Sequence, residues 1–166
     1  MNQDIIVYIG LGSNLGNKED NIKKAILLLQ EKYKTNQISS LYASEPWGYN
    51  SDSHFFNAVI CITTNESPIS VFNYLKLIES KLGRIKKNTD RYEDRIIDLD
   101  ILFYGIEIIE NETITIPHKE IHNRRFVLDP LNELAPDFIH PVLKKPIHVL
   151  LEICQDISIL EQITYN

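Results

Sequence analysis

The chain has 166 residues, of which 43% are apolar and 24% are charged, and its formal net charge is -6. This length suits one domain with a core of ordinary size, and the composition excludes a largely disordered chain. The acidic balance argues against a broad basic surface for nucleic acid, so a phosphate ligand must bind through a local basic patch or through metal ions.

The first part of the chain predicts a strand, a glycine-rich turn, a helix and two more strands. Residues 5–9 read as a buried strand, and residues 10–16, with glycine at 10, 12 and 16, read as a tight turn. Asn17 is expected to cap a helix, because Ile22, Ala25, Ile26, Leu29 and Tyr33 recur at helical spacing. A short strand at 38–42 and a polar loop at 43–53 precede a strand at 55–63.

The second part predicts a helix, a strand, a hairpin and two final helices. Ser67-Pro68 favours a helix start and Gly83 its end, with a charged loop over 84–94 and a strand over 96–104. A hairpin is expected to pair 106–109 with 114–116, Asp129-Pro130 to begin another helix, and 146–154 to form the last. The order β-α-β-β-α-β predicts an α+β fold, a ferredoxin-like antiparallel sheet covered by helices, in a single domain over 1–166.

The chain start and the cysteines bear on the cellular location. No basic stretch precedes an apolar one at the start, and no apolar run approaches about 18 residues. We therefore expect no secretory signal, no membrane span and a cytoplasmic location. Cys61 and Cys154 have no metal-ligand spacing; Cys61 is expected to be a buried small hydrophobe, and the sequence leaves a disulfide between the two open.

Asp98 and Asp100 lie two residues apart in the strand predicted over 96–104. Side chains alternate between the faces of a strand, so both carboxylates share one face, about 6–7 Å apart, while Ile97, Leu99, Ile101 and Phe103 share the core face. On spacing alone such a pair favours a plain solvated sheet face, and it is also compatible with magnesium held between carboxylates and substrate phosphates. A local surplus of positive charge precedes the pair, at Arg84, Lys86, Lys87, Arg91 and Arg95. That surplus favours a polyphosphate ligand, although charge runs are commonly plain solvated loops.

Other segments are compatible with binding or with structure alone. The glycine spacing over 10–16 lacks the dinucleotide fingerprint, so it favours a turn. Phe55 and Asn57 share one strand face. There Phe55 is suited to stack on a flat ligand while Asn57 hydrogen-bonds the ligand's edge, or Phe55 is a core residue and Asn57 a surface amide. His118 and Arg124 follow a strand exit, where they are suited to phosphate or to an exposed turn.

Four segments, in this order and spacing, resemble one family. They are Gly12-Ser13-Asn14-Leu15, the run Arg95 to Leu102 with its two aspartates, Pro117-His118, and the run Arg124 to Leu131. Together they resemble the 6-hydroxymethyl-7,8-dihydropterin pyrophosphokinases of folate biosynthesis. The resemblance spans residues 8–151 and implies transfer of pyrophosphate from ATP to the pterin hydroxymethyl group, leaving AMP, by in-line attack at the β-phosphorus.

The resemblance also implies roles for individual residues. It gives Arg84, Arg95, Asp98 and Asp100 as catalytic, with two magnesium ions on the two aspartates. Pterin-binding residues are then Ser44, Trp47, Phe55, Asn57 and Phe126, with Phe55 and Phe126 on either side of the ring. ATP-binding residues are Glu79, Arg84, Lys86, Tyr92, Arg95, Ile101, Thr115, His118 and Arg124. ATP and the pterin are the expected partners, with no nucleic acid and no membrane, and the chain is expected to be a monomer whose loops 45–51 and 84–94 close over the substrates.

The chain departs from the family pattern just before Arg95. Glu93-Asp94 replace the usual glycine-proline, Tyr92 replaces a usual tryptophan, Lys86 stands at a second basic position, and Phe55 replaces the stacking tyrosine of some members. Glu93 and Asp94 add negative charge beside incoming ATP, which predicts changed loop dynamics and an unchanged reaction.

Two other functions compete with this interpretation. A nucleotide- or RNA-binding module on a ferredoxin-like sheet lacks its usual aromatic strand signature here and is opposed by the acidic balance. A magnesium-dependent nucleotide hydrolase would use the same carboxylates with water as the nucleophile.

Overall fold

The computed structural model describes residues 4–49, 52–84 and 94–164. Its elements run in chain order β1 (Ile5–Ser13), α1 (Lys18–Lys32), β2 (Lys34–Ile38), β3 (Leu41–Ser44), β4 (Phe55–Thr64), α2 (Pro68–Lys81), β5 (Asp98–Tyr104), β6 (Ile109–Glu110), β7 (Thr115–Ile116), a 3-10 turn (Ile121–Asn123), α3 (Arg125–Leu134), α4 (Ile147–Glu152) and β8 (Glu161–Ile163). None of the helices in these ranges is long and apolar enough to cross a membrane.

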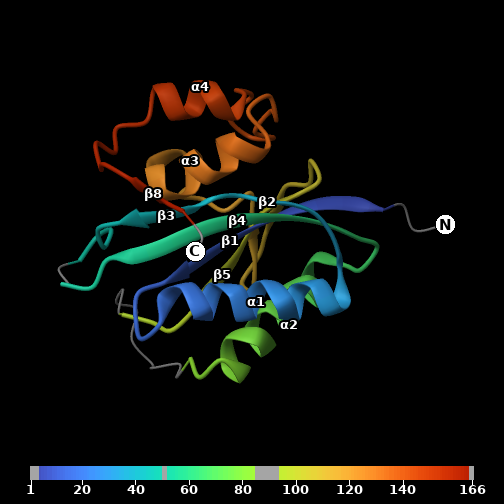
Figure 1. The fold of residues 1–166 in the computed structure, drawn as a ribbon. Helices are drawn as coiled ribbons and strands as arrows, with labels where there is room; N and C mark the ends of the chain where they lie inside the picture. The colour runs from blue at the N-terminus through green and yellow to red at the C-terminus, as the bar shows by residue number, and fades with distance from the viewer. Residues whose placement is uncertain (1–3, 50–51, 85–93, 165–166) are drawn as a thin grey trace.

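The main sheet has the order β5-β1-β4-β3-β8, with β2 also pairing with β4, and β1, β4 and β5 pair antiparallel. Helices α1 and α2 cover one face, and α3 and α4 lie over the other (Figure 1). Each face has its own apolar core, one around Ile9, Leu75 and Leu99 and one around Phe103 and Leu128. The predicted mixed α/β architecture with an antiparallel sheet is therefore confirmed.

The helix caps follow the sequence signals. The Asn17 side chain accepts a hydrogen bond from the Asp20 N–H and begins α1, and Ser67 accepts one from the Ser70 N–H and begins α2. Gly83, just after α2, has a φ of 93°, a conformation that L side chains rarely adopt. Local hydrogen bonding thus fixes these boundaries without help from distant residues.

Three predicted boundaries are wrong. The first strand continues through Gly10 and Gly12 to Ser13, because β4 and β5 pair with it on both sides and offset the weak strand preference of glycine. The strand predicted at 38–42 is two strands, β2 and β3, broken at Ser39, whose hydroxyl accepts the Val59 N–H. The hairpin of β6 and β7 is shorter than predicted, two residues on each side.

The last third departs further from the prediction. Helix α3 begins at Arg125, so Pro130 lies inside it and does not mark its start. The final helix is confirmed as α4, whereas β8, which pairs with β3, was not predicted. Cys61 is buried as expected, and both cysteines are free.

Strand β5 carries an irregularity that the alternation pattern does not predict. Ile101 pairs with Ile9 and Phe103 pairs with Tyr8, so Leu102 is an extra residue, a β-bulge. Phe103 consequently lies on the α3 side beside Leu102, and its predicted place on the Leu99 face is wrong. Asp98 and Asp100 precede the bulge and keep their shared face.

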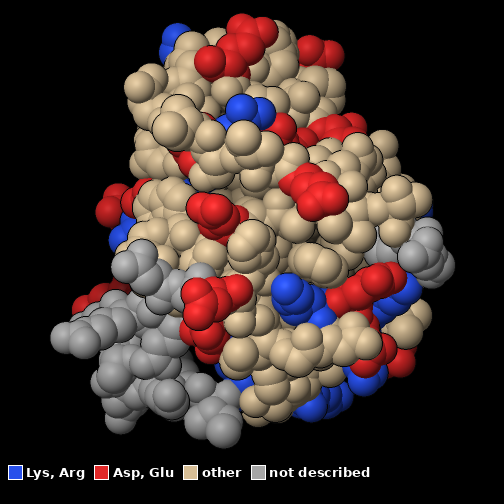
Figure 2. Space-filling view, turned by 60° about the vertical axis from the view of Figure 1, so that its left-hand side comes forward, with Lys and Arg blue, Asp and Glu red and all other residues tan. Residues whose placement is uncertain are grey.

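The face shown in Figure 2 carries acidic side chains on its upper and lower halves, with basic ones gathered mainly in the lower half. This mixture agrees with the net charge of -6.

Candidate active site

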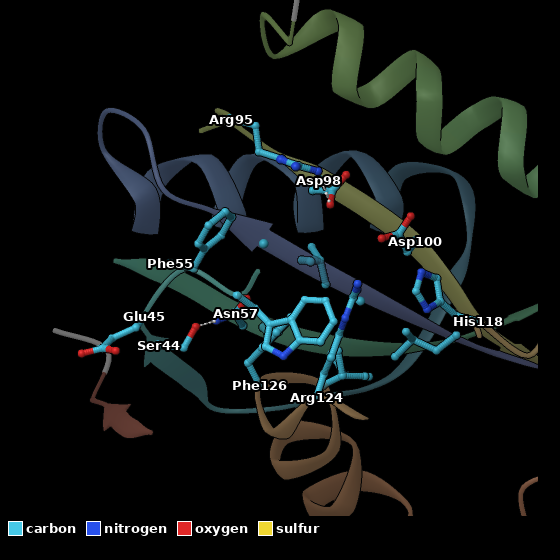
Figure 3. Close-up of a pocket in the computed structure, with 18 of the residues that line it drawn as sticks. Ser44, Glu45, Phe55, Asn57, Arg95, Asp98, Asp100, His118, Arg124 and Phe126 are labelled. Carbon is cyan, nitrogen blue, oxygen red and sulfur yellow. Dashed lines mark hydrogen bonds and ion pairs between the residues drawn. The ribbon is translucent and has the colours of Figure 1, made fainter. Parts of the chain in front are cut away.

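A cavity lies on the α3 side of the sheet, between strands β5, β1 and β4 on one side and the start of α3 on the other (Figure 3). Most of the residues that the sequence singles out line it: Ser44, Trp47, Phe55, Asn57, Arg95, Asp98, Asp100, His118, Arg124 and Phe126. Segments from five parts of the chain thus converge on one concave site, the usual form of a small-molecule site.

Asp98 is held between two arginines. Its Oδ1 accepts from Arg84 Nη1 at 2.7 Å, and its Oδ2 accepts from Arg95 Nη1 at 2.9 Å. Burial raises the pKa of Asp98, but Arg95 and Arg84 outweigh burial and leave its pKa below the usual value. Asp98 is therefore a carboxylate at neutral pH. Arg95 lines the cavity, whereas Arg84 contacts Asp98 from outside the cavity lining.

Asp100 lies beside Asp98 on the same face, as predicted, and both side chains project from β5 toward the cavity (Figure 3). Burial and the neighbouring charge of Asp98 raise the pKa of Asp100. Burial also lowers the pKa of the neighbouring His118, against the opposing effect of Asp100, so the neutral imidazole is favoured. Burial and Asp98 therefore both disfavour a negative charge on Asp100, and two carboxyl groups lie side by side at this end of the cavity.

The ring of His118 has one nitrogen engaged. Its Nδ1 accepts the Glu120 N–H at 3.2 Å, and its backbone N–H donates to the carbonyl of Leu102, the bulge residue, at 3.0 Å. The neutral ring therefore carries its proton on Nε2, which is a donor suited to a phosphate oxygen.

Glycine forms part of the cavity floor. Gly12 pairs with Asp98 across β5 and with Asn57 across β4, and Gly10 pairs with Asp100. A Cβ at Gly12 would lie 3.4 Å from Asn57 Oδ1 and 3.6 Å from Phe55 Cδ1, on the cavity side. Because these glycines carry no side chain, the cavity keeps free space above β1, between the two carboxylates and Phe55.

The opposite end of the cavity suits a flat polar ring. Phe55 stands on β4, and Phe126 rises from the start of α3 facing it across the cavity (Figure 3). Asn57 is buried, and its Nδ2 donates to Ser44 Oγ at 2.9 Å, which orients its side-chain carbonyl oxygen. Aromatic faces together with an oriented amide are the groups that hold a heterocycle and read its edge.

Trp47 contributes its ring to the site. The Arg124 guanidinium carbon lies 4.4 Å from the Trp47 ring centroid and 5.7 Å from that of Phe126, and Arg124 is buried. From the sequence, Trp47 was named only as a pterin-binding residue, and this cation–π contact was not predicted. The two residues lie far apart in the sequence, so the cation–π contact could not be predicted without the fold that brings them together.

Glu79 lies outside the cavity lining, behind β5. Its Oε1 accepts the Leu99 N–H at 2.8 Å and contacts Lys76 and Arg84, while Lys76 Nζ donates to the Leu99 carbonyl. Burial raises the pKa of Glu79 against the opposing effect of Lys76 and Arg84. Glu79 and Lys76 thus provide hydrogen-bond partners for the backbone N–H and carbonyl of Leu99 at the outer edge of β5, and Glu79 also holds Arg84 beside Asp98. A role for Lys76 was not predicted from the sequence.

Ile101 and Thr115 also lie outside the main cavity, and they line a second one that shares Asp100 and His118 with it. Three of the predicted ATP-binding residues, Ile101, Thr115 and His118, are therefore brought together. Lys86 and Tyr92, and most of the loop 84–94, lie outside the described residues.

Magnesium fits this donor set. In the described ranges, no group of three or more His, Cys, Asp and Glu side chains forms a complete protein cage. Magnesium uses one or two carboxylates together with substrate phosphates and water, so the pair Asp98 and Asp100 is sufficient. The chemistry of the donors favours a cation there, because two carboxylates on one strand face line the same cavity.

Comparisons with known proteins match the chain to one family. Residues 8–136 match the family model of 7,8-dihydro-6-hydroxymethylpterin-pyrophosphokinase (HPPK). Proteins named 2-amino-4-hydroxy-6-hydroxymethyldihydropteridine pyrophosphokinase are 41% identical in Haemophilus influenzae, over 82% of this chain and 86% of the relative, and 37% identical in Aquifex aeolicus, over 85% and 87%. Plasmodium falciparum HPPK-DHPS, solved with pteroate, has a TM-score of 0.72 at 20% identity; the match covers 92% of this chain and 42% of that one, so the chain spans less than half of its length.

Proposed function

The chain belongs to the 7,8-dihydro-6-hydroxymethylpterin-pyrophosphokinase family, and we propose that it transfers pyrophosphate from ATP to the hydroxymethyl group of 6-hydroxymethyl-7,8-dihydropterin. The hydroxymethyl oxygen attacks the β-phosphorus in line. The bond from that phosphorus to the oxygen bridging it to the α-phosphorus breaks, AMP leaves, and the hydroxyl proton is released.

One observation carries this proposal: a single cavity joins an aromatic end, with Phe55, Phe126 and Asn57, to a charged end, with Asp98 and Asp100. Transfer requires an acceptor ring and a polyphosphate side by side, in a fixed orientation. The cavity offers suitable partners for the ring at one end and for the polyphosphate at the other. Between these two ends lies the part of β1 that contains Gly10 and Gly12.

The pterin has a specific place in this proposal. Phe55 and Phe126 stack on its ring, and Asn57, oriented by Ser44, hydrogen-bonds its edge. Trp47 lies alongside and packs on Arg124. The hydroxymethyl group then points toward Asp98 and Asp100, where the phosphates bind.

The triphosphate binds at the charged end. Arg95, His118 and Arg124 line the main cavity and supply positive charge or donors for its oxygens, and Arg84 adds positive charge beside Asp98. The second cavity with Ile101 and Thr115 takes the nucleoside. We infer that two magnesium ions bind Asp98 and Asp100; when bound, magnesium neutralises phosphate charge and orients the oxygens. Because positioning and charge neutralisation do most of the work, no strong protein base is required.

We propose further that residues 1–166 act as one monomeric domain in the cytoplasm, with no nucleic acid or membrane partner. We also propose that the fold is ferredoxin-like. The strand order β5-β1-β4, with both β2 and β3 paired to β4, supports this assignment. The helices of the described ranges include no candidate membrane span.

Phosphorus NMR of the protein with ATP, magnesium and the hydroxymethyldihydropterin tests the reaction. We expect AMP and the pterin diphosphate to appear together, and only when the pterin is present. AMP or ADP without an acceptor would indicate the nucleotide hydrolase, and no turnover would favour a binding module.

A further inference from the structure

Three segments meet at the buried Asn14, which follows β1. The Asn14 Nδ2 donates to Asp94 Oδ1 at 2.7 Å, and it lies 3.3 Å from the Ser53 carbonyl and from Tyr49 Oη. The chain before β4 and the chain before β5 are therefore joined at one side chain, next to the cavity that Tyr49 and Arg95 line.

The Asp94 carboxylate is the centre of this junction. Its Oδ1 accepts from Tyr49 Oη at 2.9 Å as well as from Asn14. Burial and the hydrogen bond to Asp94 raise the pKa of Tyr49 to about 12, against the opposing effects of Asn14 and Arg95, so Tyr49 remains a donor at neutral pH. From the sequence, the negative charge of Asp94 was expected beside ATP. In the structure its Oδ1 is directed toward the two donors Asn14 and Tyr49.

The same asparagine fixes the backbone of Arg95. The Arg95 N–H donates to Asn14 Oδ1 at 2.7 Å, and the Asn14 N–H donates to the Arg95 carbonyl at 3.1 Å. At its other end, Arg95 Nη1 binds Asp98 Oδ2 at 2.9 Å. Arg95 is thus held both at its backbone and at its guanidinium.

We propose that Asp94 and Tyr49 are positioning residues for the transfer step: with Asn14 they form a clasp that fixes Arg95 against Asp98 and ties it to the segment carrying Trp47. This inference rests on the proposed function. The clasp orients positive charge before the phosphates arrive, and such preorganisation raises the rate of a reaction that depends on electrostatic positioning.

The kinetic test uses single-turnover transfer with enzyme in excess and both substrates saturating. Tyr49→Phe removes only the hydroxyl, and we expect a roughly three- to tenfold lower rate constant, the range for one lost hydrogen bond. Asp94→Ala should lose roughly tenfold or more, and Asp94→Asn, which keeps an acceptor oxygen, should restore most of the rate. The loss should fall on the rate constant more than on substrate dissociation constants.

A double mutant tests whether the two residues act as one unit. Adding Tyr49→Phe to Asp94→Ala should cost clearly less than Tyr49→Phe costs alone, because the carboxylate that accepts from Tyr49 Oη is already gone and only the longer contact with Asn14 Nδ2 remains. Tyr33→Phe is the matched control, since its hydroxyl also donates to a carboxylate, Glu66 Oε2 at 3.0 Å, and packs in the core on the α1 and α2 side of the sheet. It should leave the rate unchanged.

The single tryptophan gives a second readout that needs no substrate. Trp47 lies two residues before Tyr49 and packs on Arg124, so a released clasp should expose it. We expect acrylamide to quench its fluorescence more strongly in Tyr49→Phe and Asp94→Ala than in the wild type or Tyr33→Phe.

Wild-type transfer rates in both clasp variants, or additive losses in the double mutant, would overturn the proposal while leaving the reaction established. If the wild-type protein forms no AMP, the proposed function fails. The clasp is then judged by quenching alone: stronger quenching in the variants supports it, and unchanged quenching refutes it.

Discussion

Gly12→Ala should separate binding from folding, because the added methyl enters the cavity without straining the chain. Gly12 lies inside β1 and is absent from the glycines with positive φ, so alanine can adopt its backbone conformation. The new Cβ would meet Asn57 Oδ1 at 3.4 Å and Phe55 Cδ1 at 3.6 Å, which are ordinary contacts in the folded protein. The same space is where the proposed pterin ring lies against Phe55.

The magnitude follows from these contacts. Alanine in a strand interior is about 0.5–1 kcal/mol more favourable than glycine, so the free energy of unfolding should not fall. An extra methyl in a closely packed site costs about 1–3 kcal/mol. Since about 1.4 kcal/mol is tenfold in affinity, pterin binding should weaken about 5- to 150-fold.

Calorimetric titration with 6-hydroxymethylpterin and a non-hydrolysable ATP analogue measures the binding, and urea denaturation measures stability. Gly16→Ala is the reverse control, because Gly16 has a φ of 63° with no atom within 4 Å of a Cβ placed there. It should lose about 1 kcal/mol of stability and keep its pterin affinity. Wild-type pterin affinity in Gly12→Ala would refute the proposed position of the ring.

Three further predictions concern charge. Asp98→Ala and Asp100→Ala should each lower turnover by more than about 100-fold while the circular dichroism spectrum stays native, because both line the cavity outside the cores; near-normal turnover in either would contradict the metal assignment. Glu79→Ala removes the acceptor of the buried Leu99 N–H and leaves it without this partner, so urea denaturation should show a loss of about 1–3 kcal/mol, and unchanged stability would refute this role. Burial lowers the pKa of His140 from 6.5 to about 4, so between these values the unfolded state binds a proton that the folded state excludes, and the free energy of unfolding should fall by up to about 3 kcal/mol as pH drops from 6.5 to 4. His140→Asn should lose this pH dependence, and equal dependence in both proteins would exclude His140 as its source.

Features set by neighbouring residues were predictable from the sequence. The caps at Asn17 and Ser67 depend on hydrogen bonds to N–H groups three residues away, and the shared face of Asp98 and Asp100 depends only on strand alternation. The family resemblance added the residues of both cavities. These predictions needed no knowledge of which strands pair.

Features set by distant residues were not predictable in this way. Gly10 and Gly12 are poor strand formers, and they belong to β1 only because strands on both sides supply partners. Helix α3 starts before Pro130, where local rules favour a start at the proline; the Arg125 N–H is satisfied by Asp156, 31 residues away. The direction of the Asp94 carboxylate likewise depends on Tyr49 and Asn14.

The bulge at Leu102 links the two cores to the site. Without an extra residue, strict alternation would place Phe103 with Leu99 under α1 and α2; with it, Phe103 packs under α3 and α4 while Asp98 and Asp100 still face the cavity. The Leu102 carbonyl also accepts the His118 N–H, which places His118 beside Asp100. A single insertion in β5 therefore anchors the helix that carries Arg124 and Phe126 and also brings the histidine to the carboxylates.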